Sequence, residues 1–198
     1  EVDVLINELE TKLYENVFTP EQAKPITQEE ILDCLVKIKD LVIERNYSLY
    51  LTKLESLIHK VRLFGTHFAS LDIRQDSRIH TASLDHINQA LIDAKQTPIF
   101  PEGYTSFSEN EKIAVLEKIN TTINPAILSD PLAKDTLLSM QAMQTIQNEN
   151  GVLGCHRYII SNCQSALHMA EVYALFTLSG WKGDKTFDIV PLFETIDD

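Results

Sequence analysis

The sequence predicts a helix-rich α/β fold with about three short parallel strands. Long segments with apolar residues at helical spacing fill most of the 198 residues. Short β-branched or alternating runs separate some of these segments in the later part of the chain. Strands that alternate with helices in this way are typical of βαβ units, in which the strands run parallel.

The first third of the chain is predicted to be helical. Apolar residues recur at helical spacing in residues 1–18. Thr27 and Glu30 fit a capping box at the start of a second helix. A third helix is expected over residues 47–65, with Gly65 as its left-handed C-cap.

The periodicity changes after this point. Alternation in residues 66–73 predicts a strand. Ser77 is a suitable N-cap for a helix over residues 78–96, and Ser108 with Glu111 fits a second capping box. The remaining expected elements are two helices followed by a strand–helix–strand unit, over residues 110–120, 131–150, 156–162, 165–180 and 185–194.

Composition and charge limit the function. With 44% hydrophobic residues the chain can form one sizeable core or a large piece of a bigger one. The net charge of -12 argues against a nucleic acid or an anionic membrane as the main partner. We expect a cytoplasmic protein, because there is no apolar leader or membrane-length run. We also expect a piece of a longer protein, because the chain opens on Glu1 without a methionine and stops where a strand-like run turns polar. The cysteines form no CxxC pair, so neither a disulfide framework nor a zinc site is expected.

The strand ends are the expected place of the chemistry. No Gly-rich phosphate-binding fingerprint follows any predicted strand, which leaves a (β/α)8 barrel as the common parallel arrangement. In a barrel, Arg74 and Glu194 would each lie at the end of a strand and face one mouth. A guanidinium suits a phosphate or carboxylate, and a carboxylate at a strand end can hold Mg²⁺. The pair therefore predicts a site for a small phosphorylated acid bound through a metal.

Two structural interpretations remain open for these residues. Arg74 could pair with Asp72 or Asp76 on its own segment. Glu194, together with Asp197 and Asp198, could form the acidic first turn of a helix.

Three segments resemble one enzyme family. "LDIRQDSRIHTASLDHI", residues 71–87, resembles the L-D-I-R-Q-E-S-x-x-H-T-x-x-L-D-x-I segment of phosphoenolpyruvate carboxylase. "IVPLFETIDD", residues 189–198, is similar to that family's V-x-P-L-F-E-T-L-D-D. Between them, "RYIISNCQSALHMAEVYAL" resembles Y-I/V-I-S-M-A-x-x-x-S-D-V-L-A-V, with Asn162 in place of the methionine and His168 in place of the aspartate.

The resemblance implies an enzyme that joins phosphoenolpyruvate and bicarbonate to give oxaloacetate and phosphate, with Mg²⁺ or Mn²⁺. It implies a helix-rich barrel assembled as a tetramer, of which residues 1–198 are one internal fragment. Residues 1–65 would be a helical segment and residues 66–198 strand–helix units of the barrel. The position of Arg74 would contact the phosphate of phosphoenolpyruvate, and that of Glu194 would ligate the metal.

The catalytic set is expected to be incomplete in this chain. The family's T-x-H-P-T histidine segment, its F-H-G-R-G-G loop and a second, aspartate metal ligand are not found in the sequence. We therefore expect no turnover from the chain alone. His80 is expected to be packed or hydrogen-bonded rather than catalytic. The alternatives are a catalytically dead sensor of a phosphorylated acid, and a helical interaction module that binds no small ligand.

Overall fold

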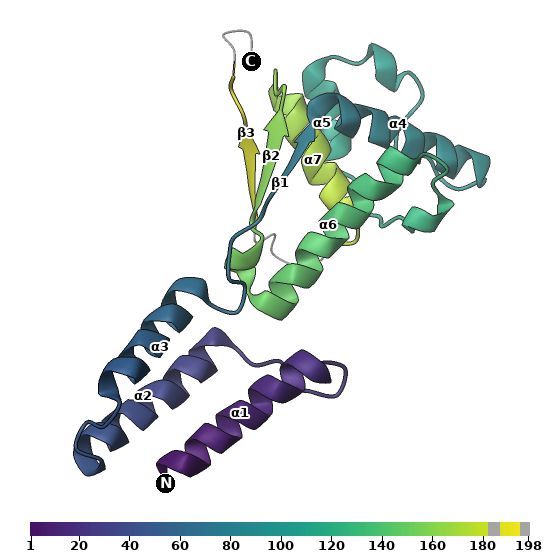
Figure 1. Cartoon of the computed structure of the whole chain (residues 1–198). Helices are drawn as coiled ribbons and strands as arrows, with labels where there is room; N and C mark the ends of the chain where they lie inside the picture. The colour runs from purple at the N-terminus through teal and green to yellow at the C-terminus, as the bar shows by residue number, and fades with distance from the viewer. Residues whose placement is uncertain (182–186, 195–198) are drawn as a thin grey trace. The chain divides into compact units, whose positions relative to one another are not determined.

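The computed structural model describes residues 1–181 and 187–194 of the chain. These residues form seven α-helices and one open sheet of three strands, which confirms the predicted helix-rich α/β class (Figure 1). The chain divides into two compact units. The first contains residues 1–70 and 148–154, and the second contains residues 71–147 and 155–198.

The first unit is built from three helices, α1 (Val2–Phe18), α2 (Gln28–Arg45) and α3 (Leu51–Phe64). The capping box predicted for α2 is confirmed: the hydroxyl oxygen of Thr27 accepts from the backbone N–H of Glu30, whose carboxylate accepts from the backbone N–H of Thr27. One apolar face of the helices makes a common core of Leu9, Ile31, Leu35, Ile38, Val42 and Ile58.

The third helix starts later than predicted, and Gly65 is its C-cap, as predicted, but not with a left-handed helical ψ. It begins at Leu51 rather than at residue 47, because Tyr47, Ser48 and Tyr50 have positive φ angles that a right-handed helix excludes. Gly65 has the expected positive φ of 53°, but its ψ of -142° lies outside the left-handed helical region. A β-carbon at this glycine would lie 2.9 Å from the ring of His67, so a larger residue would be strained by the φ angle and would require the ring to move.

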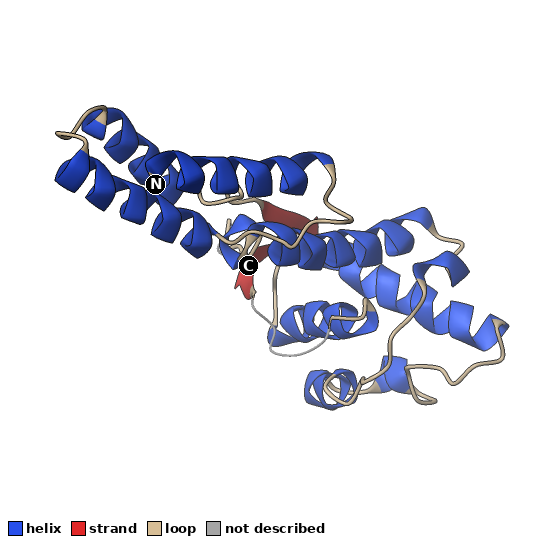
Figure 2. Ribbon diagram, turned by 90° about the horizontal axis from the view of Figure 1, so that it is seen from below, coloured by secondary structure: helices blue, strands red, loops and turns tan. Residues whose placement is uncertain are grey.

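The second unit combines the sheet with four long helical segments (Figure 2). Its elements in chain order are β1 (Asp72–Asp76), α4 (Ser77–Asp93), α5 (Glu109–Leu116), α6 (Pro131–Asn150), β2 (Arg157–Ser161), α7 (Ala166–Leu178) and β3 (Asp188–Pro191). The strand order is β1-β2-β3 and both pairings are parallel, as the alternation of strands and helices predicted. The last residues of α6 belong to the first unit.

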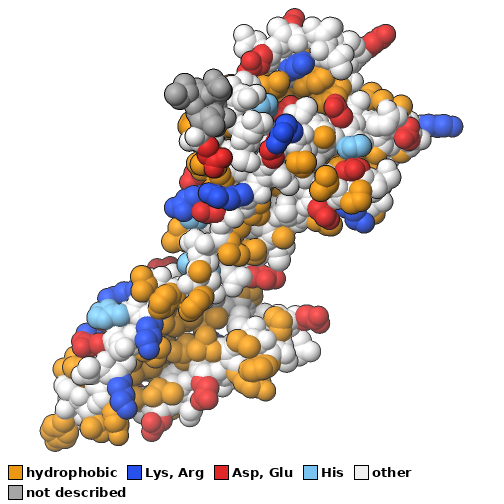
Figure 3. Space-filling model, turned by 45° about the horizontal axis from the view of Figure 1, so that its top comes forward, with side chains coloured by type: hydrophobic (Ala, Val, Ile, Leu, Met, Phe, Trp, Pro, Cys, Tyr) orange, Lys and Arg blue, Asp and Glu red, His pale blue; other side chains and the backbone are white. Residues whose placement is uncertain are grey.

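The two faces of the sheet have opposite character. Ile73, Tyr158, Ile160 and Ile189 join the core that α4, α6 and α7 form on one side. The alternate positions of the strands point to the other side, where Asp72, Arg74, Arg157 and Asp188 are exposed. The helices therefore cover one face, and the other carries these charged side chains around a row of Arg74, Ile159 and Val190 (Figure 3).

The first strand and the helix after it also differ from the prediction. The strand spans Asp72–Asp76 instead of residues 66–73, because the chain turns at Phe68, which has a φ of 59°. Asp76, not Ser77, is the N-cap of α4, and Ser77 is the first helical residue. The strand thus runs into the helix without a connecting loop.

Cys34, Cys155 and Cys163 form no disulfide bond. Among the described residues, no helix is long and apolar enough to cross a membrane.

Candidate functional site

Arg74 lies in the middle of β1, on the exposed face of the sheet. Its register partner on β2 is Ile159, which is in turn paired with Val190 on β3. Within the described part of the chain, the guanidinium of Arg74 has no hydrogen-bond or ion-pair partner. Its five N–H donors are therefore available to an anion.

The local ion pairs that could have occupied Arg74 are not formed. Asp72 pairs instead with Arg157, whose Nη1 lies 3.6 Å from Oδ1 of Asp72. Asp76 binds Arg78, with its Oδ1 2.9 Å from Nε and its Oδ2 2.7 Å from Nη2. The interpretation of Arg74 as one half of a pair with either aspartate is not supported by these contacts.

Glu194 follows the end of β3 and is exposed. The backbone N–H of Leu192 donates to the carbonyl of Ile160 at 2.9 Å, which attaches the end of β3 to β2. The alternative in which Glu194 begins an acidic helical turn involves Asp197 and Asp198, which lie outside the described residues.

The sequence predicted that Arg74 and Glu194 would occupy equivalent places, each at the end of a strand. The structure shows that they do not. Arg74 is inside its strand, in the same row across the sheet as Val190. Glu194 lies beyond Pro191, the last residue of its strand. Arg74 therefore lies two residues before the end of its strand, whereas Glu194 lies three residues after the end of its own.

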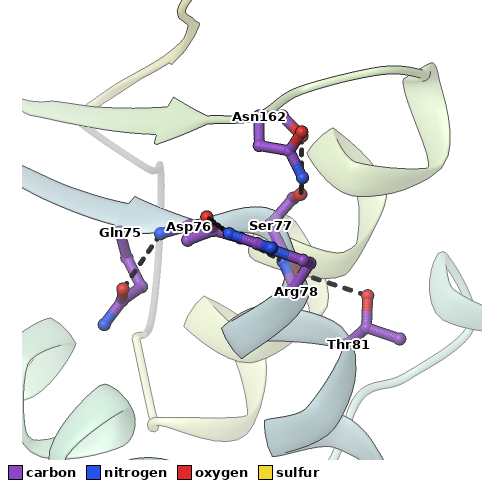
Figure 4. Close-up of polar contacts among 6 residues, drawn as sticks. All are labelled: Gln75, Asp76, Ser77, Arg78, Thr81 and Asn162. Carbon is purple, nitrogen blue, oxygen red and sulfur yellow. Dashed lines mark hydrogen bonds and ion pairs between the residues drawn. The ribbon is translucent and has the colours of Figure 1, made fainter.

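Asp76 organises the junction between β1 and α4 (Figure 4). Its carboxylate accepts from the backbone N–H of Arg78 at 2.9 Å and binds the guanidinium of the same residue. The pKa of Asp76 is lowered to about 2, mainly by the hydrogen bonds from the Arg78 side chain. The carboxylate is therefore ionised and fully engaged in capping, and is not free for a ligand.

His80 and Tyr158 form a buried polar contact behind the sheet. Nε2 of His80 lies 2.9 Å from the hydroxyl of Tyr158, and both side chains are fully buried. Burial lowers the pKa of His80 to about 4, so the ring is neutral at physiological pH. The prediction that His80 is packed and hydrogen-bonded is confirmed.

Glu171 is a buried carboxylate that the sequence analysis missed. It lies on α7, where its Oε2 accepts from the hydroxyl of Thr81 on α4 at 2.8 Å. Burial raises the pKa of Glu171 to about 7. The only signal in the sequence was a charged residue within an otherwise apolar helix, which does not by itself indicate burial.

The described residues include Glu194, the metal ligand expected from the sequence. They contain no group of three or more histidine, cysteine, aspartate or glutamate side chains that could hold a metal ion. Mg²⁺, however, commonly takes only one or two carboxylates from a protein and fills its shell with water and substrate oxygens. The exposed carboxylate of Glu194 at the edge of the sheet fits one such contribution.

Comparison with known proteins places the chain in a family of enzymes named as carboxylases. A family profile described as phosphoenolpyruvate carboxylase matches residues 6–198, and the chain belongs to that family.

Similar phosphoenolpyruvate carboxylases include those of Gloeobacter violaceus, 33% identical over 153 residues, and Parasynechococcus marenigrum, 32% identical over 154 residues. These alignments cover 73% and 74% of this chain but only 16% and 15% of the relatives. The enzyme of one Prochlorococcus marinus strain is 29% identical over 174 residues, or 81% of this chain and 16% of the relative. The chain therefore spans about 15% of the length of the curated relatives it matches.

Proposed function

We propose that the parent protein of this chain carboxylates phosphoenolpyruvate with bicarbonate, giving oxaloacetate and phosphate. Family membership supports this activity. The observation that carries it is the unpaired guanidinium of Arg74 on the charged face of the sheet, beside two aspartates that are bound to other arginines in the described part of the chain. An exposed arginine without a protein partner suits an anionic substrate.

In this proposal Arg74 binds the phosphate of phosphoenolpyruvate. The planar fork of a guanidinium matches two phosphate oxygens at once, and its charge is permanent. Phosphoryl transfer to bicarbonate and the enolate that remains both develop negative charge on oxygen. A fixed cation held before the reaction begins stabilises that charge without reorganising.

Glu194 is the proposed ligand of Mg²⁺ or Mn²⁺. A metal bound there supplies a Lewis acid for the negative charge on substrate oxygens. The attachment of β3 to β2 through Leu192 and Ile160 holds the segment before Glu194 in place. The remaining metal ligands and catalytic groups would come from parts of the parent outside this chain.

The larger assembly is also a proposal. The three parallel strands and their covering helices would be one sector of a (β/α)8 barrel, with residues 66–198 as strand–helix units of the barrel and residues 1–65 as a separate helical segment. The open β1 and β3 edges support this, because parallel strands are seldom left at an exposed edge. We further propose a cytoplasmic homotetramer.

Calorimetric titration of phosphoenolpyruvate with Mg²⁺ into the full-length parent tests the function. Arg74→Ala is expected to weaken binding about 10- to 100-fold, the effect of losing a hydrogen-bonded charge. Arg78→Ala, which removes an exposed arginine already paired with Asp76, is the matched control and should change binding less than about 3-fold. Glu194→Ala should abolish the dependence of binding on Mg²⁺.

The outcomes separate the alternatives. Arg74-dependent binding without bicarbonate-dependent phosphate release would indicate a catalytically dead sensor. Equal binding by the wild type and Arg74→Ala would contradict the assigned phosphate site. No binding in any variant would favour an interaction module without a small ligand.

A further inference from the structure

A pair of side-chain hydrogen bonds joins β1 and β2 beyond the end of their backbone ladder. The last register pair of that ladder is Asp76 with Ser161. At the residue that follows each strand, Oγ of Ser77 donates to the backbone carbonyl of Asn162 at 2.6 Å, and Nδ2 of Asn162 donates to Oγ of Ser77 at 3.3 Å (Figure 4). We call this contact the Ser77–Asn162 clamp.

The two residues suit the clamp for different reasons. Ser77 is completely buried, so water cannot replace Asn162 as the partner of its hydroxyl group. Asn162 has a φ of 53°, a region that asparagine tolerates better than most residues with a side chain. The turn after β2 and the hydrogen bond to Ser77 therefore depend on the same residue.

The Ser77–Asn162 clamp ties β1, which carries Arg74, to the central strand β2. Arg74 lies three residues before Ser77 in the sequence. In the described sheet, β2 is the only strand that pairs with β1. The end of β3, which leads to Glu194, is attached to β2 through Ile160. The strand that carries Arg74 and the strand that leads to Glu194 are therefore both attached to β2.

We propose that Ser77 and Asn162 are positioning residues, which hold Arg74 at the place where it binds the substrate phosphate. The inference rests on the proposed function. Neither residue contacts the substrate in this scheme, and both act through the position of β1. Small displacements of a binding group are costly, since a shift of about 1 Å can reduce a rate by two orders of magnitude.

The test is a double-mutant cycle in the full-length parent, with the affinity for phosphoenolpyruvate in the presence of Mg²⁺ as the readout. Ser77→Ala is expected to weaken binding about 3- to 10-fold, and Asn162→Gly, which keeps the positive φ but removes the side chain, about 3-fold. In the Arg74→Ala background the same changes should cost less than about 2-fold, because the residue they position is gone. Mg²⁺ affinity without substrate should be unchanged throughout.

Ser83→Ala is the matched control, because Ser83 is also a buried serine on α4, but its hydroxyl contacts Thr136 instead of the strand ends. It should leave the affinity for phosphoenolpyruvate within about 2-fold of the wild type. If Ser77→Ala prevents folding, the cycle with Asn162→Gly decides the question alone. Equal losses with and without Arg74, or no loss in either variant, would overturn the positioning role while leaving the proposed function intact. If Arg74→Ala binds as the wild type does, both proposals fail together.

Discussion

His80 and Tyr158 meet in the interior of the second unit, where the ring nitrogen Nε2 and the phenolic oxygen are 2.9 Å apart. The contact connects α4 to the central strand, because His80 lies in the first turns of α4 and Tyr158 lies on β2. Nδ1 of His80 is buried without a hydrogen-bond partner among the described residues. A second proton on this ring would therefore introduce an unpaired charge into the core.

We predict that His80 makes the chain less stable in acid. Its pKa is about 4 in the folded state against 6.5 for the free residue, so the unfolded state binds more protons between these values. The stability that His80 contributes is complete above pH 6.5 and is lost as the pH falls through 4. His80→Phe should remove this part of the pH dependence, which amounts to about 2 to 3 kcal/mol at pH 4.

Urea unfolding of the wild type and His80→Phe between about pH 4 and pH 8 measures the difference directly. His59, an exposed histidine on α3, provides the matched control as His59→Phe. Parallel pH profiles for the wild type and His80→Phe would show that the buried ring is not the acid-sensitive group.

For Glu171 we predict the opposite dependence of stability on pH. Burial raises its folded pKa to about 7 from 4.5, so the folded state binds more protons in this interval. Stability is therefore lost as the pH rises from 4.5 through 7. Asp85 on α4 raises the pKa further, whereas the hydrogen bond from Thr81 and the charge of Lys112 on α5 oppose the shift.

Glu171→Gln should stabilise the protein relative to the wild type by about 3 kcal/mol more at pH 8 than at pH 4, since glutamine can accept from Thr81 without carrying a charge. Unfolding free energies at the two pH values give this difference. Glu102→Gln, at an exposed carboxylate, should show no comparable change. A stabilisation by Glu171→Gln that is the same at both pH values would contradict the titration of Glu171.

Local signals explain which parts of the fold the sequence predicts. The capping boxes at Thr27 and Ser108 are complete within four residues, and both are present as predicted. The boundary at β1 could not be placed in this way, because Asp76 and Ser77 are both good N-caps. The neighbouring Arg78, which binds the Asp76 carboxylate through both its backbone and its side chain, accounts for the choice of Asp76.

The partners of the site residues could not be predicted from the sequence, because they lie far apart along the chain. Arg74 and Glu194 could be selected because they stand in long recognisable segments. The partners Ser77 and Asn162 are 85 residues apart, and Thr81 and Glu171 are 90 residues apart. Their contacts depend on the pairing of β1 with β2 and on the packing of α4 against α7, which no local pattern encodes.

Asp76 should contribute to stability through its role as a helix cap. Asp76→Ala removes the acceptor of the Arg78 backbone N–H and is expected to lower the free energy of unfolding by about 1 to 2 kcal/mol. Arg78→Ala leaves that backbone hydrogen bond in place and removes only an exposed side chain, so it should cost less than about 1 kcal/mol. Denaturant unfolding at neutral pH compares the two variants, and a larger loss in Arg78→Ala would mean that the ion pair, not the cap, stabilises the junction.

The 198-residue chain alone should have no carboxylase activity. It carries the proposed phosphate arginine and one proposed metal carboxylate, but its sequence contains no histidine followed by proline and no Gly- and Arg-rich loop like those that the family resemblance calls for. Stabilisation of developing charge requires several groups fixed around the reacting atoms, so one cation and one carboxylate cannot supply it. Phosphate release from phosphoenolpyruvate, measured with Mg²⁺ and with or without bicarbonate, should equal the rate without protein. The full-length parent assayed beside it provides the positive control, and a bicarbonate-dependent rate from the chain alone would show that the residues described here form a complete active site.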